Sequence, residues 1–292
     1  MGTSNSTKQL RAKLQIPRSP GRLLALTARY VVMAGFGVVF VFPFLFMIST
    51  SLKELDQVFV FPPEWIPREP VWENYVRIWQ VAPFGRYFLN SLIMTGGIMA
   101  GQLLVSFTAA YAFARIKFRG SSVVFLVFLA TMMVPAQTRI IPTYLLVSEI
   151  GLLNSYAALI LPVIFNAFSV FLLRQFMISI PRDMDEAAIL DGANHWQILT
   201  RVMVPLSKPV LSALSVFIFL QGWNSLLWPL IVTSSESLRV LAVGLASFSD
   251  QRGTDWPLLM TGSMIVVFPT LIVYLINQRF ITQGIVMTGL KG

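Results

Sequence analysis

Long apolar runs constrain this chain more than any other feature of its sequence. Six runs reach or approach the roughly 20 residues that an α-helix needs to cross a membrane, namely residues 23–51, 87–114, 121–133, 156–176, 206–232 and 256–277. Charged residues make up only 12% of the chain, against about 25% in soluble domains. We therefore expect an all-α integral membrane protein with six transmembrane helices.

The third run is the weakest of the six. Its apolar part stops at Pro135, and Arg139 follows soon after. Because proline has no backbone N–H to donate, it interrupts a helix. We expect a broken helix here, with residues 140–150 forming a short amphipathic continuation at or outside the membrane interface.

The ends of the chain define the domain organisation. Residues 1–22 are polar, basic and interrupted by prolines, and we expect them to form a cytoplasmic tail. The first apolar run is too long for a signal peptide and should remain as an anchor. We expect a transmembrane domain over residues 23–280 and a cytoplasmic C-terminal tail over residues 281–292.

Basic and acidic residues are distributed unequally between the loops. Cytoplasmic loops of membrane proteins are enriched in Lys and Arg. If the N-terminus is cytoplasmic, most of the 22 basic residues lie inside and most of the 13 acidic residues lie outside. This asymmetry predicts that both termini are cytoplasmic and that residues 53–86 and 233–255 are external.

Several kinds of chemistry are excluded by residues that the chain lacks. It contains no Cys and a single His, His195, which leaves no cluster for a metal ion. The runs over 87–114 and 206–232 carry no charged residue except Lys208 near one end, unlike ion-coupled transporters and membrane enzymes. No phosphate-binding loop is present. We expect a non-enzymatic protein without a cofactor of its own, driven by energy from another chain.

A polar segment between the fourth and fifth runs predicts a helix, a turn and a second helix. Asp183 is placed to cap the first helix, with Glu186 three residues later in capping-box spacing. Gly192 suits the left-handed position that ends a helix. Ala187 and Ala188 are small and would leave a flat surface for another protein to approach.

The second helix of this segment has its own start and stop signals. Asn194 and Gln197 repeat the capping-box spacing, and Pro205 is expected to end the helix because it cannot continue the hydrogen-bond ladder. A capped helical hairpin without any partner is the alternative interpretation of the whole segment.

The spacing in this segment resembles the cytoplasmic coupling loop of permease subunits of binding-protein-dependent ABC importers. The shared pattern is Glu-Ala-Ala, three residues, Gly, nine residues, then aliphatic-x-aliphatic-Pro, carried here by Glu186, Ala187, Ala188, Gly192, Val202, Val204 and Pro205. Val replaces the usual Ile and Leu before the proline. Residues 181–209 are most similar to carbohydrate importers of the maltose-permease type.

This resemblance implies a set of partners and a location in a prokaryotic cell (inner) membrane. The loop would be a coupling helix between transmembrane helices 4 and 5, docking into a cleft on an ATPase subunit. Two ABC ATPase subunits would bind the ATP, a second permease subunit would complete a heterodimer, and an extracytoplasmic solute-binding protein would deliver the solute. The ATPase-coupling candidates are Glu186, Ala187, Ala188, Asp191, Gly192 and Pro205.

The fifth run carries neutral polar and aromatic residues at helical spacing. Phe217, Gln221, Asn224 and Trp228 would share one face of a single helix. Amides and aromatic rings suit a neutral polyhydroxylated solute, although hydrogen bonding between helices is an equal alternative. The substrate-path candidates are Asn166, Gln221, Trp223, Asn224 and Trp228.

One departure from the family pattern bears on the solute. Carbohydrate importers commonly have an acid after Trp-Asn, whereas Ser225 follows Trp223 and Asn224 here. The resemblance implies import of a sugar or oligosaccharide, held by this subunit or by the second permease subunit. The alternatives are a permease for another polar solute such as glycerol phosphate, and a non-transporting membrane scaffold subunit.

Two glycines in the second run predict close helix packing. Gly97 and Gly101 form a small-xxx-small pair, which allows another helix to approach. We expect that helix to belong to the same subunit, with a contact to a second subunit as the alternative.

The predicted topology can be tested by single-cysteine labelling, because the chain has no native Cys. A Cys at Asn194 should react with a membrane-impermeant thiol reagent only after the membrane is permeabilised. A Cys at Trp65, in the loop expected outside, is the matched control and should react in intact cells. Labelling at position 194 from outside would contradict the topology.

Overall fold

The computed structural model describes residues 20–250 and 253–289, and these are mostly helical. The α-helices are α2 (Pro20–Ser51), α3 (Asn74–Val81), α4 (Phe84–Arg115), α5 (Ser121–Ala130), α6 (Ala136–Glu149), α7 (Tyr156–Ile160), α8 (Ala167–Ser179), α9 (Asp183–Leu190), α10 (His195–Gln197), α11 (Val204–Leu206), α12 (Lys208–Trp223), α13 (Leu227–Val232), α14 (Leu241–Ala246) and α15 (Trp256–Gly289). This confirms the all-α fold class.

A few short elements complete the fold. They are two 3₁₀ turns, η1 (Thr131–Met133) and η3 (Glu236–Leu238), a π-helical stretch, η2 (Ile198–Met203), and strands β1 (Ser249–Asp250) and β2 (Gly253–Thr254). The two strands pair antiparallel, with Ser249 opposite Thr254.

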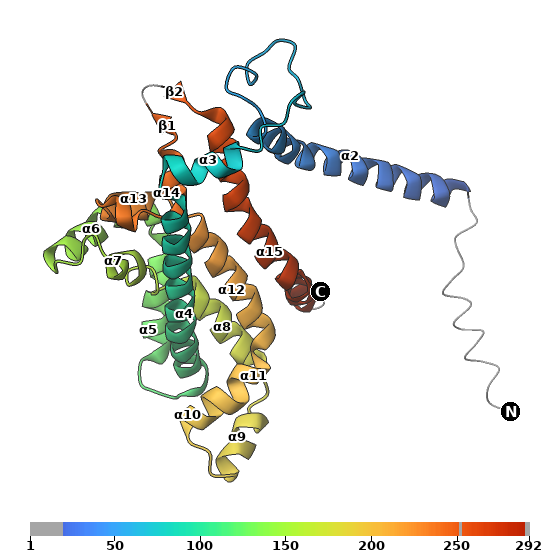
Figure 1. Ribbon diagram of the computed structural model, residues 1–292. Helices are drawn as coiled ribbons and strands as arrows, with labels where there is room; N and C mark the ends of the chain where they lie inside the picture. Colours follow the sequence, from blue (N-terminus) through green and yellow to red (C-terminus); the bar gives the residue numbers. More distant parts are fainter. Residues whose placement is uncertain (1–19, 251–252, 290–292) are drawn as a thin grey trace.

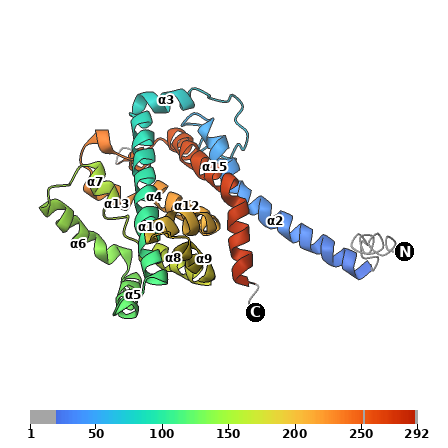
Figure 2. The same cartoon turned by 90° about the horizontal axis from the view of Figure 1, so that it is seen from below.

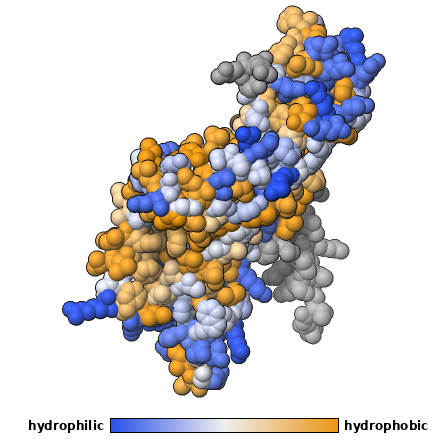
Figure 3. All heavy atoms as spheres, turned by 60° about the vertical axis from the view of Figure 1, so that its left-hand side comes forward, coloured by the Kyte–Doolittle hydropathy of each residue, from blue (hydrophilic) through white to orange (hydrophobic). Residues whose placement is uncertain are grey.

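Three helices in the described ranges are long and apolar enough to cross a membrane: Leu24–Ser51, Phe84–Arg115 and Trp256–Gln278. The number rises to five if each of two bent helix pairs is one span. The expected count of six is therefore not confirmed. Figure 3 shows hydrophobic residues over much of the middle of one face and hydrophilic residues gathered at the lower tip.

The third apolar run is broken, as its proline predicts. Ser121–Met133 and Ala136–Glu149 meet at an angle of 103°. Pro135 is the N-cap of α6 and has an extended ψ of 139°, which turns the chain out of the first helix. The short helical continuation is confirmed as α6.

The fourth and fifth runs are also interrupted, which the sequence analysis did not predict. Residues 161–166 separate α7 from α8, and Asn166 caps the new helix by accepting a hydrogen bond from the Ser169 N–H. The fifth run ends its first helix at Trp223 and resumes as α13. Pro229 lies in the first turn of α13, where the missing N–H has no partner to lose.

The long helix α4 is the centre of the fold. It packs against α8 and α12 along its length and also contacts α7 and α14 (Figure 1). Buried side chains from α4, α8 and α12 form the main apolar core, which includes Met94, Phe107, Leu173 and Leu214. A smaller core at the end that carries α3 is built around Phe84 and Trp223.

The first helix lies apart from this core. α2 extends away from the other helices in both ribbon views (Figures 1 and 2), and its contacts are with α15 near its C-terminal end. None of its most apolar stretch is buried. Large side chains such as Phe40 and Val38 are therefore exposed along it.

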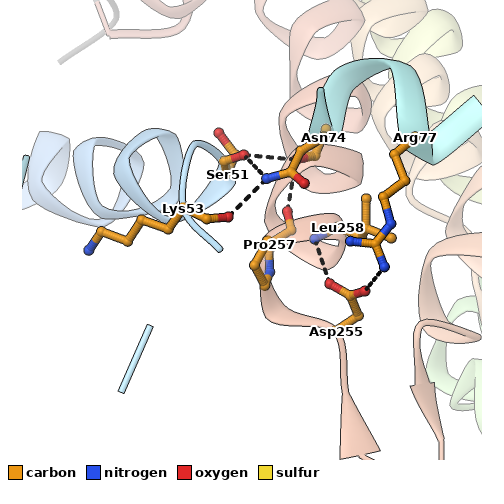
Figure 4. A network of polar contacts seen from close by, with 8 residues as sticks. Ser51, Lys53, Asn74, Arg77, Asp255, Pro257 and Leu258 are labelled. Carbon is orange, nitrogen blue, oxygen red and sulfur yellow. Dashed lines mark hydrogen bonds and ion pairs between the residues drawn. The ribbon is translucent and has the colours of Figure 1, made fainter. Parts of the chain in front are cut away.

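The end of α2 is held by a polar network that joins three helices (Figure 4). The Asn74 side chain on α3 donates to the carbonyls of Ser51 and Lys53, at 3.0 and 2.9 Å. Thr261 on α15 donates to the same Ser51 carbonyl at 3.3 Å. Ser51 is the last residue of α2 and Lys53 follows it, so the hydrogen-bond ladder of the helix does not pair their carbonyls. The network therefore satisfies groups that burial would otherwise leave unpaired.

The glycine pair on α4 receives another segment of the same subunit, as expected. A side chain at Gly97 would lie 2.6 Å from Ile160, and one at Gly101 would lie 2.8 Å from Ile164. Both distances are shorter than ordinary contacts between side chains, so even Ala at either position would require the side chain of Ile160 or Ile164 to shift.

The expected tails fall largely outside the described ranges. Residues 1–19 and 290–292 are not described, while α15 runs as one helix through Gly289. The boundaries of both tails stay predictions.

Replacing Asn74 with Leu tests the network in Figure 4. The change keeps the side-chain size but removes both hydrogen bonds, and an unsatisfied buried carbonyl costs about 1–3 kcal/mol. We expect a lower melting temperature for the purified complex in detergent. The control is Gln80→Leu, an exposed amide on the same helix, which should leave the melting temperature unchanged. Equal melting of N74L and wild type would contradict this role.

Candidate functional site

The polar segment folds as the expected hairpin at one end of the molecule, where α9, α10 and α11 lie together in Figure 1. We call residues 183–206 the coupling hairpin. The prediction that Asp183 caps this helix is wrong. The N-cap residue is Arg182, whose side chain makes no capping hydrogen bond, and Asp183 is the first helical residue. Three acids in the first turn, Asp183, Asp185 and Glu186, instead favour the helix by facing the positive end of its dipole.

Gly192 ends α9 in the predicted left-handed conformation, with φ of 82°. Its N–H donates to Ile189 at 2.9 Å, and the Ala193 N–H donates to Ala188 at 2.9 Å. These two bonds form a Schellman motif, which satisfies carbonyls at the end of the helix. No atom lies within 4 Å of a side chain built at Gly192, so the backbone conformation alone favours glycine.

The second half of the coupling hairpin begins with the predicted capping box. Asn194 accepts from the Gln197 N–H at 2.9 Å, and the Gln197 side chain accepts from the Asn194 N–H at 2.8 Å. Pro205, however, does not end the helix. The chain stays helical through Leu206, since Pro205 lies in the first turn of α11, directly after the π-helical stretch η2, and there needs no N–H partner. The chain then bends by 79° before α12.

The coupling hairpin exposes large apolar side chains although it is a polar segment overall. Met184, Ile189, Leu190 and Trp196 are 52%, 54%, 89% and 61% exposed. Apolar residues gathered on a polar tip are typical of a protein interface.

The predicted coupling residues are mostly accessible on this surface. Glu186, Ala187, Asp191, Gly192 and Pro205 are exposed, while Ala188 is half-buried against the main core. Their contact with a partner stays a prediction.

Two side-chain contacts, which the sequence analysis missed, join the coupling hairpin to the last turns of α4. Arg115 Nε lies 2.8 Å from Asp185 Oδ2, with the two side chains only 5% and 14% exposed. Tyr111 Oη and His195 Nδ1 share a hydrogen bond at 3.1 Å. Burial raises the pKa of the Asp185 carboxyl above its ordinary value, and the Arg115 guanidinium partly offsets this.

A groove of about 310 Å³ lies among α4, α8 and α12. Its lining residues are Gln102, Asn166, Phe168, Ser169, Leu214, Phe217, Ile218 and Gln221. Gln102 donates to Ser169 Oγ at 2.7 Å, and Ser169 Oγ lies 3.3 Å from Asn166 Oδ1. Gln102 Oε1 is buried and has no hydrogen-bond partner within the described residues. The groove thus combines neutral polar groups with exposed aromatic rings.

The structure brings together only part of the predicted substrate path. Asn166 and Gln221 line the groove with Phe217. Trp223 is 1% exposed and donates to the Val266 carbonyl, so it is a core residue at that point.

The prediction that Gln221, Asn224 and Trp228 share one face of a single helix is wrong, because α12 ends at Trp223. Asn224 is exposed and donates to Leu220, and Trp228 on α13 donates to the Ala158 carbonyl at 3.0 Å. The signals near this end are Gly222 in the last turn and Asn224 at the C-cap, residue types common at helix ends, whereas Pro229 lies six residues further on.

Metal binding has no candidate site within residues 20–250 and 253–289. Among these residues, no three His, Asp or Glu side chains gather closely enough to hold an ion.

Comparison with known proteins places this geometry in a family. Residues 102–283 match the family described as "Binding-protein-dependent transport system inner membrane component". The sn-glycerol-3-phosphate transport system permease protein UgpE of Yersinia pestis bv. Antiqua (strain Antiqua) is 35% identical over 247 residues, covering 82% of this chain and 88% of that protein. The probable ABC transporter permease protein YurM of Bacillus subtilis (strain 168) is 30% identical over 272 residues, covering 91% and 89%.

Solved structures agree on the fold. A chain from a bacterial ABC transporter involved in the import of the acidic polysaccharide alginate superposes with a TM-score of 0.81 at 23% identity, covering 90% of this chain and 98% of that chain. A chain from a bacterial alginate ABC transporter in complex with an alginate pentasaccharide-bound periplasmic protein superposes with a TM-score of 0.58 at 16% identity, covering 88% of this chain and 93% of that chain.

The family match covers more than half of the chain and the relatives align over most of their length, which confirms the resemblance. The chain belongs to the family of inner-membrane permease components of binding-protein-dependent ABC transport systems.

Proposed function

We propose that this chain is the pore-forming subunit of an ATP-driven importer of a sugar or oligosaccharide, delivered by an extracytoplasmic binding protein. The observation that carries the proposal is the groove among α4, α8 and α12. Its amide and hydroxyl groups and its exposed rings, Phe168 and Phe217, match the hydroxyls and apolar faces of a sugar ring.

The relatives leave one alternative solute open. By name, one relative belongs to a transport system for sn-glycerol-3-phosphate, and one protein of similar fold takes part in the import of alginate, an acidic polysaccharide. The groove residues of this chain are uncharged, whereas a phosphate or carboxylate is usually bound by Arg or Lys. This favours a neutral polyhydroxylated solute over glycerol phosphate. Competition of uptake by unlabelled sugars, but not by glycerol phosphate, is the expected result.

Energy would come from two separate ATPase subunits. The absence of a phosphate-binding loop in the sequence and the exposed apolar side chains of the coupling hairpin support docking of such a subunit here. Closure of the ATPases on ATP would move the hairpin and switch the open side of the pore. With the charge asymmetry of the loops, this arrangement would place the hairpin and both termini in the cytoplasm.

A second permease subunit would complete the pore. The apolar surface of α2 is uncovered by this chain, and lipid or a second subunit could contact it. A non-transporting scaffold subunit is the alternative to the transporter. The deciding measurement is ATPase activity of the reconstituted complex: a transporter should be stimulated by the loaded binding protein, while a scaffold should not respond.

Substitutions in the groove test the substrate path. Gln221→Leu removes an exposed amide that caps no helix, so we expect uptake with an apparent KM raised about 2- to 10-fold, as for one neutral hydrogen bond of about 0.5–1.5 kcal/mol. Asn224→Leu and Trp228→Leu should also impair uptake if the path extends beyond the groove. The ATPases should still co-purify. Normal uptake by all three variants would contradict a role in the substrate path and would show that these residues serve in packing.

Substitution of Gly192 tests docking by the coupling hairpin. Gly192→Val strains a left-handed residue by about 1–2 kcal/mol and redirects the second half of the hairpin. We expect loss of ATPase co-purification or of uptake per ATP, with normal membrane insertion. Gly120→Val is the matched control, because Gly120 has the same φ of 82° and equally open surroundings.

Glu186→Gln is the milder arm of the same experiment. Glu186 is exposed and makes no cap, so its charge is available to a basic residue on the ATPase. Removing it should weaken association by about 1.5–3 kcal/mol, the scale of a charged hydrogen bond. Wild-type uptake, ATPase stimulation and co-purification in both G192V and E186Q would refute the coupling role.

A further inference from the structure

The last two turns of α4 contact both halves of the coupling hairpin. Arg115 faces Asp185 on α9, and Tyr111, one turn earlier, faces His195 on α10. The peptide chain itself connects the hairpin to α8 and α12. Within the described residues, these two contacts are the polar links between the hairpin and α4, to which the hairpin has no direct chain connection.

Arg115 holds a third element at the same point. Its Nη2 donates to the Ile180 carbonyl at 2.8 Å, at the C-terminal end of α8. One guanidinium therefore joins the ends of α4 and α8 to the first turn of α9. Its planar array of donors can reach several acceptors at once, which a lysine ammonium does less well.

Stability alone does not account for this ion pair. Replacing a buried ion pair by apolar residues of similar volume is often neutral or stabilising. Arg115 Nε and Asp185 Oδ1 have no hydrogen-bond partner in the described part of the chain, so the 2.8 Å contact is an ion pair without hydrogen-bond geometry and the pair is incompletely satisfied. α9 needs no such support, because its C-terminus is closed by the Gly192 turn and its other first-turn acids, Asp183 and Glu186, are exposed.

α4 connects this contact to the groove. The helix is continuous from Phe84 to Arg115, and Gln102 on it lines the groove 13 residues before Arg115. At 1.5 Å per residue the separation is about 20 Å along one rigid helix. A displacement of the first turn of α9 that is transmitted to Arg115 would therefore reach Gln102 in the groove along this helix.

We propose that Arg115 and Asp185 are a positioning pair that transmits movement of the coupling hairpin to α4 and so to the solute groove. The inference rests on the proposed function and adds the residues through which ATP hydrolysis reaches the pore. Neither residue needs to touch the solute or the ATPase in this role. Loss of the pair should separate hydrolysis from transport without releasing the ATPases.

The experiment measures solute imported per ATP hydrolysed by the complete complex in proteoliposomes, with its ATPases and loaded binding protein. Asp185→Asn keeps the side-chain shape and removes the charge. We expect ATPase co-purification and hydrolysis to persist while import per ATP falls roughly tenfold, a usual size for coupling between two sites. Arg115→Lys, which keeps the charge, should retain more coupling than Arg115→Met.

Asp183→Asn is the matched control, because Asp183 is an exposed acid in the same helical turn. It should import as much solute per ATP as wild type. An equal loss in D183N and D185N would assign the effect to the charge of the turn and overturn the proposal, as would wild-type coupling in D185N.

D185N leaves the buried Arg115 unpaired, which could lower the amount of folded permease. A double variant separates that effect from a loss of coupling. Asp185→Leu with Arg115→Met removes both charges, so protein levels should recover while import per ATP stays low. Recovery of coupling in this variant would overturn the positioning role. Failure of the wild-type complex to import any solute would refute the proposed function instead.

Discussion

The rest of this structure depends on one constraint: a backbone group that meets hydrocarbon must find its hydrogen-bond partner within the protein. Long helices satisfy it along α4 and α15, and side chains satisfy it wherever a helix stops. Asn74 donates to the carbonyls at the end of α2, and Asn166 accepts from the Ser169 N–H at the start of α8. These two amides thus mark places where the path of the backbone changes.

The breaks permitted in this way shape the groove. α8 begins at the break after α7, and α12 stops at Trp223, so both helices are shorter than α4. Gly97 and Gly101 let the segment between α7 and α8 approach α4 closely. The neutral polar residues Gln102 and Ser169 then meet across the interface between α4 and α8. A groove suited to hydroxyl groups follows from how these helices end and pack.

Sequence analysis predicts features that depend on local chemistry and misses those that depend on tertiary contacts. The left-handed Gly192, the Asn194–Gln197 capping box and the break at Pro135 all follow from rules that act over a few residues. The end of α12 carries only the weak signals of Gly222 and Asn224, and the prediction of one helical face through Trp228 was wrong. Arg115 and Asp185 lie 70 positions apart in the sequence, and the residues around either one do not indicate that the two side chains are in contact.

The coupling hairpin closes its own hydrogen bonds, through the Gly192 turn and the Asn194 cap, without help from another chain. Such a segment is ordered before any partner arrives. If an ATPase subunit docks here as proposed, association would avoid the entropy loss of ordering a loop, and more of the contact energy at Leu190 and Trp196 would remain as affinity. The hairpin would then need no refolding in each transport cycle.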